Sequence, residues 1–219
     1  MTETAKPPLR RDARRNVERL LQAAAELFRE RGLHVPLEEI AQRAGVSPGT
    51  LYNRFSGRDA LIDAVMPAML EARVHEALAR AEAAQDPWDG FVLYVTLLCE
   101  LQATDPALND AVSRRFPDAE QLTAICDAQL DRARGVIGKA QQAGVLRADF
   151  TSEDLVHLFW STSMTVRATA GIAPDAWRRG LALALDGLRA PAAHPLPVPP
   201  LTKSQVQAAM IGLGRRKDR

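Results

Sequence analysis

Residues 37–61, LEEIAQRAGVSPGTLYNRFSGRDAL, decide the fold of this 219-residue chain. Gly45 follows the last periodic apolar position of the first segment and suits the left-handed geometry of a helix C-terminus. Ser47 then offers a hydroxyl as N-cap, and Pro48 takes the first helical position, where its missing N–H costs nothing. The stretch therefore predicts a short helix, a tight turn and a second short helix, which is a helix-turn-helix.

The second helix of this pair has one apolar side and one polar side. Leu51 and Phe55 fall within about 40° of each other at 100° per residue, so both point to the core. The opposite side carries small and polar residues, which lets it approach bases and phosphates in a major groove. Ser56 and Asp59, spaced as a capping box, predict the start of a third helix. Sequence-specific DNA binding is the leading hypothesis, and a helical hairpin whose polar face meets only water is the alternative.

From about residue 14 to residue 66 the sequence resembles the TetR family of transcriptional regulators. The family pattern is a first helix ending in an aromatic residue and a glycine, an I-A-x-x-A-G-V-S turn, a G-T-L-Y-x-x-F recognition helix, and a basic residue three positions later. In this chain the matching positions are, in order, Leu27-Phe28 with Gly32, residues 40–47, residues 49–55 and Arg58.

The resemblance implies which residues meet DNA. Thr50 and Tyr52 would contact the backbone or base edges, and Asn53 would help to choose the base. Arg58 would take a phosphate at a helix N-terminus. Pro36 stands where family members usually have threonine and cannot give the hydroxyl contact, so it is left out. The residues predicted to bind DNA are Arg14, Arg15, Ser47, Pro48, Gly49, Thr50, Tyr52, Asn53 and Arg58.

Charge is distributed unevenly along the chain. Residues 1–65 carry 11 Lys and Arg against 9 Asp and Glu, residues 66–190 carry 12 against 17, and residues 191–219 carry 5 against 1. An acidic body with basic ends suits a DNA-binding protein, because only one surface then attracts phosphates. The densest basic cluster, residues 10–15, fits an arm along the DNA backbone or minor groove, and it equally fits a solvated terminus.

The composition points away from several other classes. No apolar run reaches the length of a membrane span, and the basic N-terminus lacks the apolar segment of a signal peptide. Two cysteines are too few for a disulfide framework, so we expect a reduced, cytoplasmic protein. The four histidines show no metal-ligand spacing, and no phosphate-binding or nucleophile motif is present. We therefore expect no metal, no cofactor and no enzyme activity.

The rest of the chain predicts further helices and no strands, so the fold class is all-α. Asp86-Pro87 and Asp105-Pro106 each pair an N-cap with a first-position proline, and Thr151 with Asp154 resembles a capping box. We expect a DNA-binding domain over residues 1–57, with its motif at about 37–56, and a helical effector-binding and dimerisation domain over residues 58–190. A proline-rich linker and basic tail follow over residues 191–219. Within the tail, residues 202–213 have a helical apolar pattern. The tail fits docking on the body, holding DNA, or disorder, and we expect disorder because it is a terminus.

The resemblance also implies a partner and a ligand. The family dimerises through its last two helices, here about residues 152–170 and 175–189, and a two-fold dimer would explain the binding of a palindromic operator. An unknown small-molecule effector would bind inside the second domain and release the DNA. The candidate effector-binding residues are Phe91, Tyr94, Trp160 and Met164. A homodimeric repressor is the favoured hypothesis, and a helical protein-interaction module without specific DNA recognition is the alternative.

Overall fold

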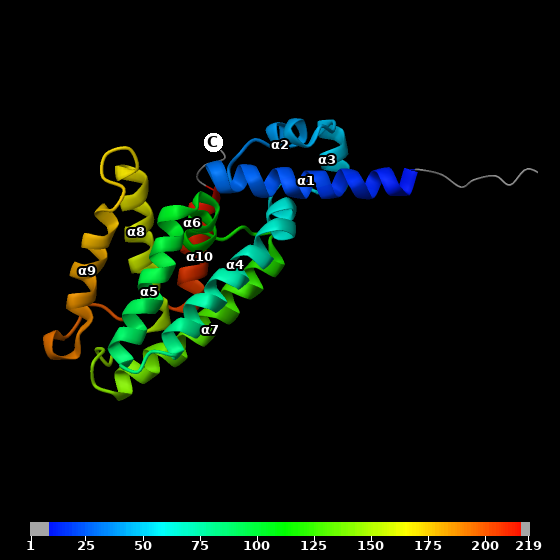
Figure 1. The fold of residues 1–219 in the computed structure, drawn as a ribbon. Helices are drawn as coiled ribbons and strands as arrows, with labels where there is room; N and C mark the ends of the chain where they lie inside the picture. The colour runs from blue at the N-terminus through cyan, green and yellow to red at the C-terminus, as the bar shows by residue number, and fades with distance from the viewer. Residues whose placement is uncertain (1–8, 216–219) are drawn as a thin grey trace, which may run out of the picture.

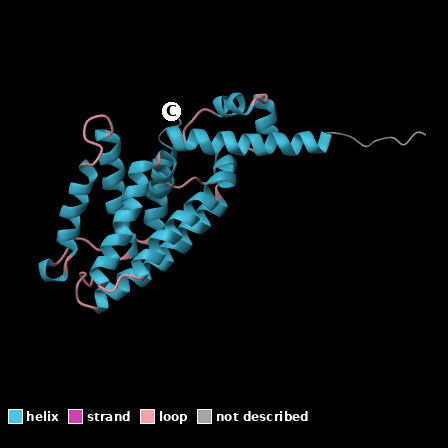
Figure 2. Cartoon of the chain, viewed as in Figure 1, coloured by secondary structure: helices cyan, strands magenta, loops and turns pink. Residues whose placement is uncertain are grey.

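The computed structural model describes residues 9–215, and the secondary structure of this part consists of helices without a β-strand (Figure 2). The predicted all-α class is therefore confirmed. Figure 1 shows a small head, formed by the first three helices, lying at one end of a larger helical body. None of the described helices is long and apolar enough to cross a membrane.

The head consists of α1 (Leu9–Arg31), α2 (Leu37–Ala44) and α3 (Pro48–Arg54). α2 and α3 lie along one side of α1 (Figure 1). Gly45 ends α2 with φ +64°, and the Ser47 hydroxyl accepts a hydrogen bond from the first turn of α3. The turn signals predicted from the sequence are confirmed, and the helix-turn-helix is present.

α4 (Arg58–Glu82) connects the head to the body, and its start corrects one prediction. The capping box proposed for Ser56 and Asp59 is wrong, because Gly57 is the N-cap and no side chain caps this end. The Asp59 carboxylate instead accepts a hydrogen bond from the backbone N–H of Asp118 at 3.2 Å. The residue is used in a tertiary contact that local spacing does not reveal.

Asp63, one turn further along α4, caps a different helix. Its carboxylate accepts the backbone N–H groups of Gln121 at 3.2 Å and Leu122 at 2.8 Å, in the first turn of α7. No side chain within α7 performs this function, since Ala119 is its N-cap. α4 therefore stabilises the start of α7, and the two helices pack along one another through the body.

The remaining body helices begin and end close to the predicted positions. Asp86 and Asp105 each accept two backbone N–H groups as N-caps, and Thr151 and Asp154 form the predicted capping box. The body helices are α5 (Pro87–Thr104), α6 (Pro106–Ser113), α7 (Glu120–Gln142), the short 3-10 helix η1 (Ser152–Asp154), α8 (Leu155–Thr169) and α9 (Ala176–Leu188). One continuous apolar core runs from α1 in the head to α9 at the far edge.

The tail contains a 3-10 turn, η2 (Ala190–Ala192), and a helix, α10 (Lys203–Arg215), which packs on the body. Val206 and Met210 are buried against Val156 of α8. The Arg115 backbone N–H donates to the Met210 carbonyl at 3.2 Å. The predicted disorder of the tail is wrong as far as residue 215, because the apolar stripe of this helix covers apolar surface on the body. The predicted basic end extends to residues 216–217, which lie outside the described part of the chain.

Candidate nucleic-acid interface

The outward face of α3 carries the side chains predicted to meet DNA. Leu51 and Phe55 are buried, as the helical count predicted. Thr50 is half-buried, and the Tyr52 side chain is 49% exposed. The other exposed residues on or beside this helix are Ser47, Pro48, Gly49, Asn53 and Arg54. The helix therefore presents a small, polar surface of the kind that fits a DNA groove.

The turn before α3 is fixed by side-chain hydrogen bonds. The Ser47 Oγ accepts from the Thr50 backbone N–H at 3.2 Å and lies 2.9 Å from the Thr50 hydroxyl. On the other side of the turn, Arg19 of α1 donates to the Gly45 carbonyl at 3.4 Å. These contacts fix the turn before α3 and tie it to α1, so the outward side of α3 is held in one orientation.

A carboxylate lies within this face. The Tyr52 hydroxyl donates to Glu38 Oε1 at 3.2 Å, linking α3 to α2. That hydrogen bond, together with the charge of Glu38, raises the pKa of Tyr52 above its ordinary value. A phosphate approaching Tyr52 therefore meets both a hydroxyl donor and the negative charge of Glu38.

Arg58 lies at the start of α4 and is half-buried. Its Nη1 donates to the carbonyl oxygens of Leu33 at 3.0 Å and Val35 at 2.5 Å. In this arrangement the guanidinium braces the turn between α1 and α2. The phosphate contact suggested for Arg58 stays a prediction.

The basic residues of α1 are on the surface. Arg14 and Arg15 are exposed, and Arg14 forms an ion pair with Glu18 at 3.2 Å. Such an exposed pair contributes little to stability and exchanges readily for a phosphate. Arg54 is exposed in the last turn of α3 and was not among the residues predicted to bind DNA, although it directly follows Asn53 in the sequence.

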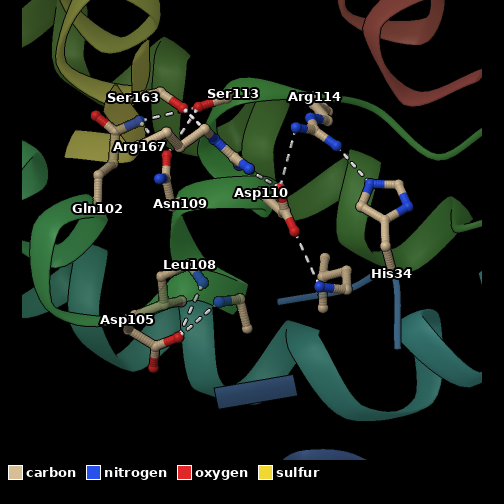
Figure 3. A network of polar contacts seen from close by, with 12 residues as sticks. His34, Gln102, Asp105, Leu108, Asn109, Asp110, Ser113, Arg114, Ser163 and Arg167 are labelled. Carbon is tan, nitrogen blue, oxygen red and sulfur yellow. Dashed lines mark hydrogen bonds and ion pairs between the residues drawn. The ribbon is translucent and has the colours of Figure 1, made fainter. Parts of the chain in front are cut away.

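A polar network centred on Asp110 joins the head to the body (Figure 3). Asp110 is on α6, and its carboxylate accepts the backbone N–H of Leu33 at 2.9 Å. The same carboxylate pairs with Arg167 of α8 at 2.6 Å and Arg114 at 3.4 Å, and Arg114 in turn contacts His34. One carboxylate thus links the α1–α2 turn of the head to a helix at the far side of the body.

Gly32 explains how the backbone comes this close to Asp110. The glycine has φ +84°, and a Cβ built on it would lie 2.7 Å from Asp110 Oδ2. Any other residue would therefore strain the backbone and crowd the carboxylate. In the sequence Gly32 stands out only as part of a family pattern, because the carboxylate that it approaches is 78 positions further along the chain.

The predicted effector-binding residues do not lie together. Tyr94 lines a cavity of about 50 Å³ that is partly open to the surface, between α4, α5, α6, α7, α8 and α10. Phe91 is fully buried and packs against Trp88 and Phe150 outside that cavity. Trp160 and Met164 line a surface hollow between α8 and α10. Of the four residues, Tyr94 lines this cavity, and the effector-binding role of all four stays a prediction.

Large apolar side chains are exposed on and beside the last two body helices. Met164 on α8 is 68% exposed, Leu183 on α9 is 63% exposed, and Ile172 in the connecting loop is 86% exposed. α9 lies at the outer edge of the body and packs mainly on α8 (Figure 1). These are the two helices predicted to form the dimer contact.

Comparison with known proteins places both parts of the chain. Residues 20–65 match the family described as bacterial regulatory proteins, tetR family. Residues 86–190 match the family described as transcriptional regulator SbtR-like, C-terminal domain. Together the two matches include the helix-turn-helix and the body from α5 to the end of α9, and residues 66–85 lie between them.

Curated relatives match over part of their length. The chain is 35% identical over 72 residues to the uncharacterized HTH-type transcriptional regulator YvdT of Bacillus subtilis, covering 32% of this chain and 37% of that protein. It is 28% identical over 132 residues to the HTH-type transcriptional regulator TtgR of Pseudomonas putida, covering 58% of this chain and 61% of that protein. The matched stretch is thus less than two thirds of either relative.

Solved structures show the same fold at low identity. The regulator RolR in complex with resorcinol has a TM-score of 0.57 and 23% identity, over 86% of this chain and 98% of that one. The regulator FadR from Bacillus subtilis in complex with stearoyl-CoA has a TM-score of 0.60 and 15% identity, over 81% of this chain and 100% of that one. Both likenesses are of fold.

Proposed function

Since this chain belongs to the TetR family of transcriptional regulators, we propose that it is a homodimeric repressor, which a small-molecule effector releases from a palindromic operator. The single observation that carries the proposal is the exposed polar face of α3 on a fixed turn. In this proposal residues 1–57 bind DNA, residues 58–190 bind the effector and the second copy, and residues 191–219 form an appended tail. The protein acts in the cytoplasm as a regulator without catalytic activity.

We assign the DNA contacts to the outward side of α3 along its whole length. Thr50 and Tyr52 contact the backbone or base edges, and Asn53 contributes to base choice, because Asn53 lies opposite the buried Leu51 and the other two lie on the flanks of that side. Gly49 and Pro48 permit a close approach of the α3 backbone. We add Arg54 as a phosphate contact, since it is exposed in the last turn of the same helix.

We assign the dimer contact to α8 and α9. The exposed Met164, Ile172 and Leu183 support this assignment, because covering apolar side chains of this size with a second copy lowers the free energy of the dimer. A two-fold dimer would bring two copies of α3 to successive turns of one face of the DNA. This arrangement predicts a palindromic binding site.

The proposed effector acts by a shift between two arrangements of the head and the body. Asp110 supports such a coupling, because it contacts the α1–α2 turn and α8 at once. The ligands in the RolR and FadR structures support an effector that is a small molecule. A ligand that moves α6 or α8 would change how the head is held.

A selection of genomic DNA fragments tests the proposal. The full chain is incubated with sheared genomic DNA at two salt concentrations, and the bound fragments are sequenced. Recovery of one palindromic sequence supports the repressor. Recovery of only random fragments that are lost at the higher salt concentration would overturn it and favour the interaction module.

Point variants then test the assigned face. Thr50→Ala and Tyr52→Ala are expected to weaken binding to the selected site by about ten- to hundredfold, as loss of a base or phosphate contact typically does. Lys139→Ala, on the exposed surface at the end of α7, serves as the control and is expected to bind like the parent chain. Unchanged operator affinity in both α3 variants would contradict the assignment.

A further inference from the structure

The cavity beside Tyr94 is partly open to the surface, and apart from the Tyr94 hydroxyl its polar groups come from two side chains. Its walls come from α4, α5, α6, α7, α8 and the tail helix, and no acidic side chain lines it. The apolar and sulfur-bearing lining residues are Leu70, Val74, Tyr94, Leu98, Val112, Cys126, Leu130, Val156, Phe159 and Met210. The two exceptions are Arg115 and Gln129. At about 50 Å³, the cavity has room for roughly four water-sized groups.

Arg115 is a buried cation without an ion-pair partner among the described residues. Its side chain is 6% exposed, although arginine is rarely buried unless a carboxylate neutralises it. Nη1 donates to the carbonyls of Ala111 at 3.3 Å and Arg114 at 3.1 Å, while the buried Nε has no hydrogen-bond partner. An unpaired N–H on a buried guanidinium is costly and favours an acceptor that comes from outside the chain.

The acidic side chains near Arg115 already have other partners, since Asp131 and Glu153 both pair with Arg134. Asp127 lines a smaller cavity of about 20 Å³ on the other side of Arg115, beneath α10. Its carboxylate forms an ion pair with Lys203 at 3.0 Å and accepts a hydrogen bond from Gln207 at 3.4 Å, so its partners are on α10.

Gln129 provides a second unpaired polar group at the same cavity. Its side chain is 8% exposed, and Oε1 is buried without a hydrogen-bond partner. A half-turn of the amide would present its N–H₂ group in place of the oxygen, so Gln129 can serve either a donor or an acceptor. The two residues, on different elements, line one cavity, and a ligand head group reaches their unpaired atoms once the side chains turn toward it.

We propose that this cavity binds a small anionic ligand, a carboxylate on a short apolar chain, with Arg115 as its charge partner. The carboxylate accepts from Arg115 Nε, Gln129 bonds to the same head group, and the chain lies among the apolar walls. A bidentate or charge-assisted contact of this kind is stronger than one between neutral groups. The inference rests on the proposed function, because it names the chemical class of the effector. Ligand binding itself is measured without DNA.

The probe is butanoate, with butanamide and butylamine as neutral and cationic analogues of the same length. The full chain is labelled with ¹³C at the methionine methyl groups, and each compound is titrated while the methyl signals are recorded. Met210 lines the cavity and reports on its occupation, whereas Met164 is exposed on α8 and serves as an internal control. Butanoate is expected to shift the Met210 signal and leave Met164 unchanged, with butanamide binding about tenfold or more weakly.

Variants of Arg115 separate charge recognition from folding. Arg115→Met is expected to weaken butanoate binding about ten- to hundredfold and to abolish the preference for butanoate over butanamide. Arg115→Lys keeps the charge and is expected to keep the preference. Arg73→Met, an exposed arginine on α4, is the matched control and is expected to bind like the parent chain. Met210→Ala enlarges the cavity and is expected to move the preference toward hexanoate, which gives a readout that does not depend on an Arg115 variant folding.

Three results would overturn the proposal. These are equal binding of butanoate and butanamide to the parent chain, a preference for butanoate that survives in Arg115→Met, and no shift of the Met210 signal with butanoate. Failure of the DNA selection would leave these titrations unaffected, so the two proposals fail separately. A ligand that binds here without altering operator affinity would contradict only the proposed effector response.

Discussion

Replacement of Asp110 by alanine is expected to loosen the head from the body. The change removes the acceptor of the Leu33 N–H, and a buried N–H without a partner costs about 1–3 kcal/mol. It also removes the partner of Arg114, whose side chain is 11% exposed against 3% for Asp110. Arg167 is 33% exposed, so solvent screens that pair and it contributes under about 1 kcal/mol. The total loss is about 3–5 kcal/mol, as for other buried pairs deprived of one partner.

Two measurements check the loss in free energy of unfolding and show whether it arises at the contact between Asp110 and the head. The free energy of unfolding is obtained from urea titrations of Asp110→Ala and of Asp105→Ala, which changes the same residue type in the same helix. The Asp105 carboxylate caps the first turn of α6, so its loss is expected to cost about 1 kcal/mol. Hydrogen exchange at the Leu33 amide is expected to accelerate only in Asp110→Ala. A loss within about 1 kcal/mol of the Asp105 variant, with Leu33 still protected, would refute the reasoning.

Three further predictions concern the interface, the thiols and the dimer. Glu38→Gln removes a negative charge beside Tyr52, so operator affinity is expected to rise about two- to fivefold, and the pKa of Tyr52 is expected to fall toward its ordinary value. Weaker operator binding in a fluorescence titration would contradict this prediction. Burial raises the pKa of Cys99 to about 12 and also raises that of Cys126, so both thiols stay protonated at pH 8, and Ellman's reagent is expected to react with them only after unfolding. A fast reaction of the reagent with the folded protein would contradict this prediction. Leu183→Glu places a charge on the exposed face of α9 and is expected to shift the protein from dimer to monomer in light scattering; a persistent dimer would place the contact elsewhere.

Much of the fold could be predicted from the sequence because its signals are local. Gly45 needs a positive φ, and Ser47 and Pro48 fit only the start of a helix, so the turn follows from three neighbouring residues. Asp86 and Asp105 cap helices within their own first turns. In each case the residue and the backbone groups that it satisfies are a few positions apart.

The parts that were missed or wrong depend on contacts between distant residues. Asp59 has the spacing of a capping box, but it accepts the N–H of Asp118 from another segment. Asp110 reads as an ordinary polar helix residue, and its partner Leu33 lies 77 positions earlier. The burial of Arg115 likewise follows only from packing, because arginine in a sequence predicts a surface residue.

The tail was misjudged for a related reason. Val206 and Met210 are spaced as one helical face, but the pattern is short and ends near the terminus. Whether such a helix docks depends on the surface that receives it, here formed by Val156 and the segment around Arg115. That surface is assembled from several elements and has no signature in the sequence.

The covalent tether of α10 has a thermodynamic consequence. Residues 193–202 form a proline-rich linker without helix or strand, so docking of the helix is an intramolecular event whose extent does not change on dilution. A short linker that spans the distance gives an effective concentration on the order of 1 mM, so an intrinsic dissociation constant of about 10 µM keeps the helix docked about 99% of the time. A free molecule that competes for the same surface must bind more strongly, at its own concentration, than the tethered helix does at its effective concentration. A displaced helix stays attached to the protein and docks again when the competitor dissociates.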